Sequence, residues 1–213
     1  MDFSILTQLN VLVQLMCVII VAAYLLTRSR IFLEILEGHP TFLDKIILVV
    51  LFGLLSIYGS ISGIEFMGSV VNVRDLGPML AGLLAGPWVG VGAGLIGAVY
   101  RLSMGGLTVY ACSAAAVFAG LFGGIVWLWK KKQFAGTTIA VLLAILMESF
   151  HMVLVLLTVR PFDVALTVVL RVYIPMVVAN AVGMYVFCVM VRNFRHEHEL
   201  QVEHDARTRD KEQ

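Results

Sequence analysis

Six long apolar runs, separated by short polar breaks, make up most of the chain. An α-helix needs only about 20 apolar residues to cross the hydrocarbon core of a bilayer, so each run is long enough for one crossing. The sequence therefore predicts an all-α fold, a polytopic bundle of membrane helices. The runs are Ile5–Thr27, Lys45–Ile64, Gly77–Tyr100, Thr108–Trp129, Thr137–Val159 and Val164–Val191.

The composition excludes several classes of protein. Hydrophobic residues make up 60% of the 213 residues, charged residues make up 14%, and the mean hydropathy is +0.95. Soluble domains average about 45–50% apolar and about 25% charged residues, which excludes a soluble enzyme. A separate catalytic domain would need roughly 100 further residues. The net charge of +1 gives no case for nucleic-acid binding.

The cysteines indicate neither a disulfide framework nor a zinc site. Cys17, Cys112 and Cys188 lie far apart, each inside an apolar run, whereas both kinds of site show characteristic spacings. Near the C-terminus, His196, His198 and His204 stand among charged residues, and we expect them to face solvent rather than to bind a metal. The sequence therefore predicts no metal and no cofactor.

The third apolar run contains Gly86-Pro87 at its centre. Proline removes a backbone donor and clashes with the preceding turn of a helix, and glycine makes a sharp reversal easy. Two arrangements are compatible with this pair. The run is either one kinked crossing, or a re-entrant hairpin of two short half-helices, Gly77–Ala85 and Pro87–Tyr100.

The distribution of basic residues favours the hairpin. Cytoplasmic loops of membrane proteins carry an excess of Lys and Arg. If residues 77–100 return to their own side, 11 of the 15 Lys and Arg residues fall on one side of the membrane. We therefore expect five full crossings, an N-terminus outside and a C-terminus in the cytoplasm. The amphipathic first loop, residues 28–44, is expected in the interface plane.

Small residues are concentrated around the expected hairpin. Twelve of the 19 glycines lie between Gly77 and Gly124. Gly82, Gly86 and Gly90 begin a series with a spacing of four residues, which lets helix backbones approach each other closely. The pattern predicts tight helix packing, compatible with a compact scaffold around a small cavity.

A few ionisable residues interrupt the apolar runs, and such residues are functional candidates in membrane proteins. Arg74 precedes the first half-helix and Arg101 ends the second, so the hairpin places both at one level on the outer side. Guanidinium groups bind carboxylates bidentately, and half-helix N-termini point at anionic ligands in membranes. These features predict a site for a small carboxylate, with Glu148, Arg171 and Asn180 as further polar residues of the helices.

Each candidate also has an ordinary structural interpretation. Arg74 and Arg101 are compatible with interfacial anchors that extend to lipid phosphate. Glu148 is compatible with a structural partner of His151 or Arg171, and Cys112 with a small packing residue.

The motifs together resemble the LytS/YhcK-type five-transmembrane receptor family. The resemblance covers nearly the whole chain up to about residue 193, and its most specific part runs from Asn72 to Cys112. It rests on Asn72-x-Arg74, GPMLAGLLAGPWVGVGAGLIGAVYRLSMGGLT, Cys112, Glu148, Arg160-Pro161-Phe162, Pro175 and Asn180-x-x-Gly183.

The resemblance implies a multi-pass sensor domain in the bacterial inner membrane. In this family an output module follows, usually a histidine kinase of a two-component phosphorelay and sometimes a diguanylate cyclase. Members are linked to control of autolysis and the cell wall, or to sensing metabolites such as pyruvate. By similarity, Asn72, Arg74, Arg101 and Cys112 would line the ligand site.

Three further residues complete the predicted ligand site. Ser113 is a weaker match, because the small polar residue expected one turn further on is here Ala115. Glu148 and Arg171 are included for their polarity within apolar runs, and Arg171 lies outside the family motifs.

The expected domain organisation is a transmembrane sensor domain, residues 1–192, followed by a charged cytoplasmic linker, residues 193–213. No motif of a kinase, an ATP-binding region or a cyclase occurs among these residues, so the chain is not expected to be an enzyme. The expected partners are a small pyruvate-like carboxylate, the lipid bilayer, an output kinase or cyclase module and a second copy in a homodimer.

A transport function is the alternative. The pattern G-P-x-x-A-G-x-x-x-G-P-x-x-G, at residues 77–90, is also similar to substrate-binding membrane components of vitamin uptake systems. The charged linker favours signalling, because a transport component has no evident need for it.

Overall fold

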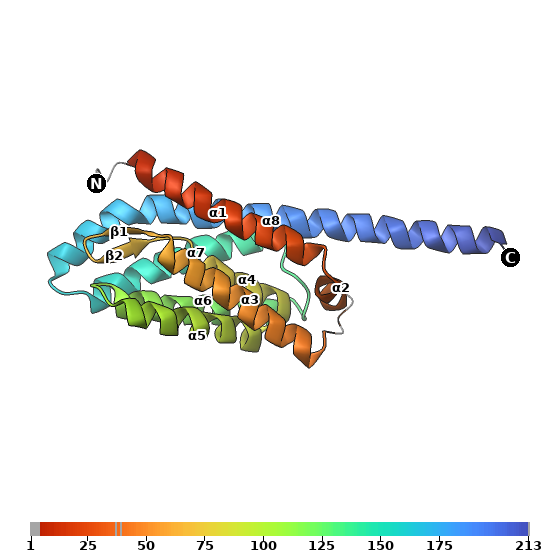
Figure 1. Cartoon of the computed structure of the whole chain (residues 1–213), viewed down its shortest axis with the longest axis horizontal. Helices are drawn as coiled ribbons and strands as arrows, with labels where there is room; N and C mark the ends of the chain where they lie inside the picture. Colours follow the sequence, from red (N-terminus) through yellow and green to blue (C-terminus); the bar gives the residue numbers. More distant parts are fainter. Residues whose placement is uncertain (1–4, 37, 39, 213) are drawn as a thin grey trace.

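The computed structural model describes residues 5–36, 38 and 40–212, and within them the chain forms eight α-helices and one small β-hairpin (Figure 1). The elements are α1 (Ile5–Thr27), α2 (Arg30–Leu36), α3 (Phe42–Ile61), β1 (Ile64–Phe66), β2 (Ser69–Val71), α4 (Leu76–Ala85), α5 (Pro87–Met104), α6 (Val109–Trp129), α7 (Thr137–Thr158) and α8 (Phe162–Glu212). The predicted all-α membrane bundle is confirmed.

Four helices of the described residues are candidates for a membrane crossing, and α1 is a further long helix. Among the described residues, α3, α6, α7 and the first part of α8 are both long and apolar enough to span a bilayer. Helix α1 has 23 residues and runs beside α8 (Figure 1). One end of the bundle carries the β-hairpin formed by β1 and β2, together with the α5–α6 loop. We call it the hairpin end after this β-hairpin (Figure 1). At the other, the linker end, α8 leaves the bundle (Figure 1).

Helices α4 and α5 form the expected hairpin. Gly86 ends α4 with a φ of +93°, a conformation that glycine adopts without strain, and Pro87 begins α5. The two helices pack side by side (Figure 1). The kinked single crossing is therefore not what the chain forms.

The hairpin is longer than the expected pair of short half-helices. Helix α5 has 18 residues and continues to Met104, about 27 Å at 1.5 Å per residue. At the turn, Gly86 packs against Trp127 and Pro87 against Gly124, near the end of α6. The turn of the α4–α5 hairpin therefore lies close to the linker end. All ten residues of α4 are buried, so other helices rather than lipid surround its short length.

Glycines allow the backbones of α4, α5 and α6 to touch. A Cβ atom on Gly120 would lie 2.0 Å from the carbonyl oxygen of Gly90, and one on Gly82 would lie 2.4 Å from that of Gly120. A Cβ on Gly94 would lie 2.5 Å from the carbonyl oxygen of Ala116. Only glycine fits at these positions, which confirms the tight packing that the sequence predicts.

The β-hairpin was not predicted, because residues 64–71 read as a connection between apolar runs. Its strands pair antiparallel, and Met67 and Gly68 form the turn with φ values of 50° and 74°. Gly68 accepts a hydrogen bond from the Leu107 amide at 2.9 Å. This hydrogen bond attaches the β-hairpin to the α5–α6 loop. The β-hairpin thereby positions the segment between β2 and α4.

The loop between α1 and α3, which contains α2, packs against α8 at the linker end. The amphipathic loop contains α2, whose buried Phe32 contacts Phe194 edge to face at 5.4 Å, and Arg28 pairs with Glu197 at 3.1 Å. Residues 37 and 39 of this loop lie outside the described residues. Helix α8 continues without a break through the expected linker to Glu212 and extends beyond the bundle (Figure 1).

Adding one methyl group at the α5–α6 contact should destabilise the bundle. Gly120→Ala places a Cβ against backbone atoms that have no room to move, and overpacking of this kind costs about 1–3 kcal/mol or more. Thermal unfolding in detergent measures the loss. Gly136→Ala is the control, because a Cβ there meets nothing within 4 Å. Equal midpoints for both variants would contradict the close packing.

Candidate functional site

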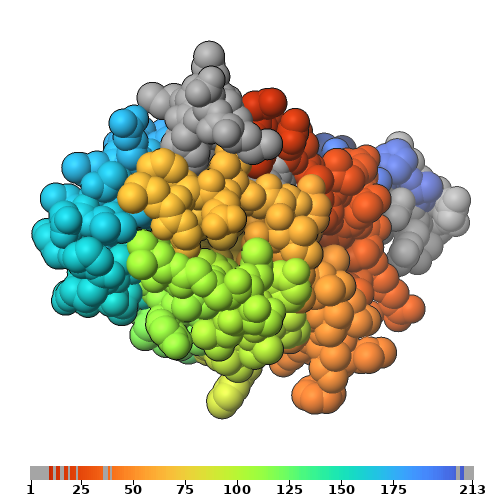
Figure 2. Space-filling model, turned by 60° about the vertical axis from the view of Figure 1, so that its left-hand side comes forward, coloured from red at the N-terminus to blue at the C-terminus, as the bar shows by residue number. Residues whose placement is uncertain are grey.

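A cluster of buried polar side chains lies under the hairpin end. Figure 2 shows this end of the molecule, where β1–β2, the end of α5 and the α7–α8 connection close over the interior. The cluster draws on the segment between β2 and α4, and on α5, α6, α7 and α8. Its members are all at most 5% exposed: Asn72, Arg74, Asp75, Arg101, Thr108, Cys112, Ser113, Glu148, His151 and Asn180.

The segment before α4 holds Arg74 in place. Asn72 Oδ1 accepts a hydrogen bond from the Arg74 amide at 3.0 Å, a local turn that asparagine side chains commonly form. The Arg74 guanidinium donates from Nη2 to the Cys112 carbonyl oxygen at 3.0 Å, and its Nε lies 3.3 Å from Asp75 Oδ1. Its Nη1 has no hydrogen-bond partner among the described residues.

Asp75 is the carboxylate partner of Arg74. Its other oxygen, Oδ2, lies 3.1 Å from His151 Nδ1. Asp75 was not among the predicted site residues. The one signal for it in the sequence was an acidic side chain next to Arg74 in an apolar region.

Arg101 is a second buried guanidinium at this end, 1% exposed on the last turn of α5. Its Nη1 donates to the Gly105 carbonyl oxygen, while Nε and Nη2 have no hydrogen-bond partner in the described part of the chain. No acidic side chain of the described residues lies at ion-pair distance from Arg101. An unpaired buried charge is expensive, so this group is the strongest candidate for contact with an anion.

Cys112 links Arg74 to α7, because its carbonyl oxygen accepts from Arg74. Its Sγ lies 3.4 Å from Thr108 Oγ1 and 3.4 Å from His151 Nε2. Ser113 instead faces α5, because its hydroxyl donates to the Ala98 carbonyl oxygen at 3.3 Å. Both residues are therefore buried in the cluster, with Cys112 directed toward His151 and Ser113 toward α5.

Glu148 and His151 share one face of α7, as their spacing predicts. His151 Nδ1 lies 3.3 Å from Glu148 Oε1 and 3.1 Å from Asp75 Oδ2. Asn180 of α8 donates from Nδ2 to Glu148 Oε2 at 2.9 Å. The interpretation of Glu148 as a partner of His151 matches this geometry.

Arg171 does not join the cluster. Its side chain is exposed on α8, and Glu148 contacts His151 and Asn180 instead. The structure thus brings together six of the seven predicted ligand residues and leaves Arg171 outside. Helical spacing cannot reveal this, because the face that a residue presents depends on how α8 packs.

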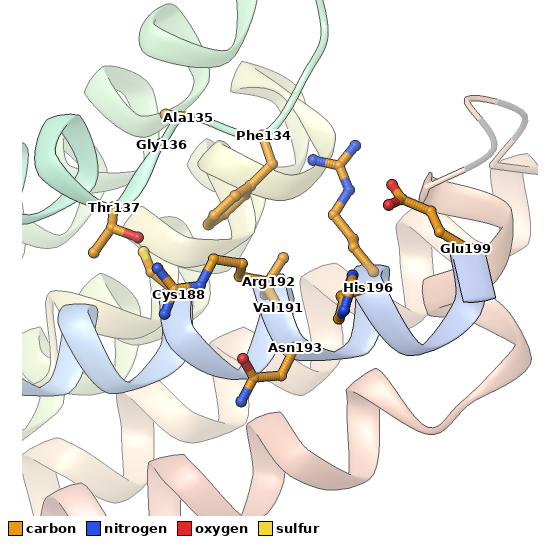
Figure 3. A pocket seen from close by; sticks show the side chains of 11 residues that line it. Phe134, Ala135, Gly136, Thr137, Cys188, Val191, Arg192, Asn193, His196 and Glu199 are labelled. Atoms are coloured by element: carbon orange, nitrogen blue, oxygen red, sulfur yellow. The ribbon is translucent and has the colours of Figure 1, made fainter.

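A separate cavity of about 540 Å³ opens at the linker end. Figure 3 shows Phe134 and Thr137 on one side of it and the side chains of α8, including Arg192 and His196, on the other. It lies where α8 leaves the bundle, at the opposite end from the buried cluster. Its lining carries both basic and acidic groups, since Glu199 also borders it.

Comparison with known proteins identifies the family. A family model described as "5TMR of 5TMR-LYT" matches residues 29–194. The chain belongs to this family of five-transmembrane receptor domains. It is therefore a membrane sensor domain of the LytS type, as the sequence motifs indicated.

Curated relatives are sensor proteins. Sensor protein LytS of Bacillus subtilis (strain 168) is 30% identical over 193 residues, covering 82% of this chain and 32% of the relative. Sensor histidine kinase BtsS of Escherichia coli (strain K12) is 32% identical over 182 residues, covering 83% and 32%. The chain thus spans about a third of the length of these relatives. No solved structure matches it.

The contact between Asn180 and Glu148 should contribute to stability. Asn180→Ala leaves a buried carboxylate oxygen without its donor, which costs about 1–3 kcal/mol. The control is Thr167→Ala, which removes an exposed hydroxyl from the same helix and should change stability by less than about 0.5 kcal/mol. Chemical unfolding in detergent compares them. Equal losses would show that the buried contact adds nothing.

Proposed function

We propose that this chain is the ligand-binding part of a bacterial receptor. It binds a small carboxylate metabolite at the hairpin end and transmits the binding event through α8 to an output module of the histidine kinase type. The observation that carries the proposal is Arg101, a buried guanidinium with two nitrogens that have no hydrogen-bond partner among the described residues, and Arg74 is a second buried guanidinium of the same cluster.

The chemistry of these groups favours a small anion. Guanidinium N–H groups form short, charge-assisted hydrogen bonds to carboxylates, and such bonds strengthen where water is excluded. Arg74 already has Asp75 as a partner at 3.3 Å, whereas the one partner of the Arg101 side chain among the described residues is the Gly105 carbonyl oxygen. A monocarboxylate at Arg101 would therefore balance the one buried cation that lacks a counter-ion among the described residues.

The distribution of charge supports an outer location for the site. The loop that contains Lys130, Lys131 and Lys132 lies at the linker end (Figure 1), as do Arg28 and the charged part of α8. By the positive-inside rule this end faces the cytoplasm. The hairpin end, with Arg74 and Arg101, then faces outward, and the start of α1 lies on the same outer side.

Helix α8 connects the site to the cytoplasm. It contributes Asn180 to the buried cluster and continues unbroken to Glu212, a distance of about 48 Å at 1.5 Å per residue. A ligand shifts an equilibrium between two packings by its difference in affinity for them. A change of packing around Asn180 would move the far end of α8, in a receptor that we expect to be a homodimer.

The relatives favour signalling over transport. They are named as sensor proteins and sensor histidine kinases. The glycine–proline pattern that suggested a transport component has a structural role here, since Gly86 and Pro87 form the turn between α4 and α5.

Removal of the Arg101 side chain should weaken carboxylate binding. Hydrogen bonds to charged groups contribute about 1.5–3 kcal/mol, so Arg101→Ala should weaken binding by about 10–150-fold. Calorimetric titration of the detergent-purified chain with acetate, pyruvate, lactate and succinate measures this. Arg74→Ala should show a similar loss, with thermal unfolding reporting whether each variant is folded.

The matched control is Arg171→Ala, which removes an arginine that is exposed on α8. It should bind the same carboxylates as wild type does. If folded Arg101→Ala and Arg74→Ala both bind as tightly as wild type, the anion site is not here. Loss of binding in Arg171→Ala alone would move the site to the exposed face of α8.

A further inference from the structure

Three buried donor atoms from two parts of the chain face one another below Arg74. They are His151 Nδ1 and two carboxylate oxygens, Asp75 Oδ2 and Glu148 Oε1, which lie 3.1 Å and 3.3 Å from it. They belong to residues that are at most 3% exposed, and each of the three residues offers a ligand atom within 4.8 Å of the others. Asp75 comes from the start of α4, and the other two come from α7. Two carboxylates and an imidazole in one water-excluded place form a set of ligands for a metal ion.

A different partner holds the second polar atom of each side chain. Arg74 Nε lies 3.3 Å from Asp75 Oδ1, and Asn180 Nδ2 donates to Glu148 Oε2 at 2.9 Å. Cys112 Sγ lies 3.4 Å from His151 Nε2. Metal sites show this arrangement, in which neighbouring groups orient each ligand through the atom that does not bind the ion.

The three inward atoms make no hydrogen bond among the described residues. His151 Nδ1 is close to both oxygens, at 3.1 Å and 3.3 Å, but the angles do not suit an N–H···O bond, which prefers to be near linear. When a histidine nitrogen binds a tetrahedral ion, the ion lies on the axis of that nitrogen. The other ligand atoms then lie to the side of this axis, where an N–H group could not donate to them. At zinc bond lengths of about 2.0–2.1 Å, neighbouring ligand atoms are about 3.3 Å apart.

We propose that Asp75, Glu148 and His151 bind a divalent transition-metal cation of the zinc type. The cation would neutralise two buried carboxylates, of which only Asp75 has an arginine partner, and it would tie the start of α4 to α7. This site goes beyond the proposed function. It uses none of the free nitrogens of Arg101, so carboxylate binding and metal binding stand or fall separately.

Metal content of the purified chain tests the proposal. The full chain, purified with a tag that contains no histidine, is loaded with Zn²⁺, dialysed extensively and measured by plasma mass spectrometry. Wild type should retain about one zinc ion per chain, and His151→Ala and Glu148→Gln should each retain less than about a fifth of that, since tetrahedral sites need all their protein ligands. Asn180→Ala, which removes an orienting partner, should bind zinc about 10–100-fold more weakly.

The control removes the other histidines of α8 that could bind zinc. The triple variant His196→Ala, His198→Ala and His204→Ala should retain the ion. Glu148→Gln changes no volume, and its thermal midpoint without metal shows whether it folds. A chelator should lower the midpoint of zinc-loaded wild type but not that of His151→Ala.

Two results would overturn the proposal. One is a wild-type chain that retains no zinc after dialysis, which would mean that a proton on His151 holds the two carboxylates together. The other is zinc that is lost in the triple histidine variant and retained in His151→Ala, which would place the ion on the charged part of α8.

Discussion

The burial of Arg74 and Asp75 inside a membrane bundle is the constraint on which the rest of the structure depends. A buried ion pair is tolerated only where hydrogen bonds satisfy both partners. Here the Cys112 carbonyl oxygen on α6 accepts a hydrogen bond from the Arg74 guanidinium, and His151 Nδ1 on α7 lies 3.1 Å from Asp75 Oδ2. Each contact comes from a different part of the chain, so the pair forces the segment before α4 to meet α6 and α7 at one point.

The α4–α5 hairpin makes that meeting point possible. The short helix α4 begins inside the protein, at Leu76, rather than at a membrane surface. Glycine contacts such as Gly120 on Gly90 let α5 and α6 pack close enough to surround it. The scaffold therefore buries the polar side chains of the hairpin end, and charge-assisted hydrogen bonds are stronger in such surroundings than in water.

The sequence was most informative about features that depend on local pattern. Length and apolar content predicted the crossings, and Gly86-Pro87 with the basic residues predicted the hairpin. The full length of α5, the β-hairpin and the exposure of Arg171 were not predictable in this way. They depend on packing between distant segments, as do the contacts of His151 with Asp75 and Cys112. Spacing along one helix therefore identified Glu148 and His151 as neighbours but could not show what they face.

Solid-state NMR tests the central claim of a carboxylate on Arg101 most directly. The chain, labelled with ¹⁵N-arginine and reconstituted in lipid, is incubated with pyruvate labelled with ¹³C at its carboxylate. Paired guanidinium and carboxylate groups place that carbon within about 4 Å of the guanidinium nitrogens, so a ¹³C–¹⁵N dipolar contact should appear and vanish in Arg101→Lys with Arg74→Ala. A contact that persists in this double variant, or that vanishes in Arg171→Ala, would contradict the account.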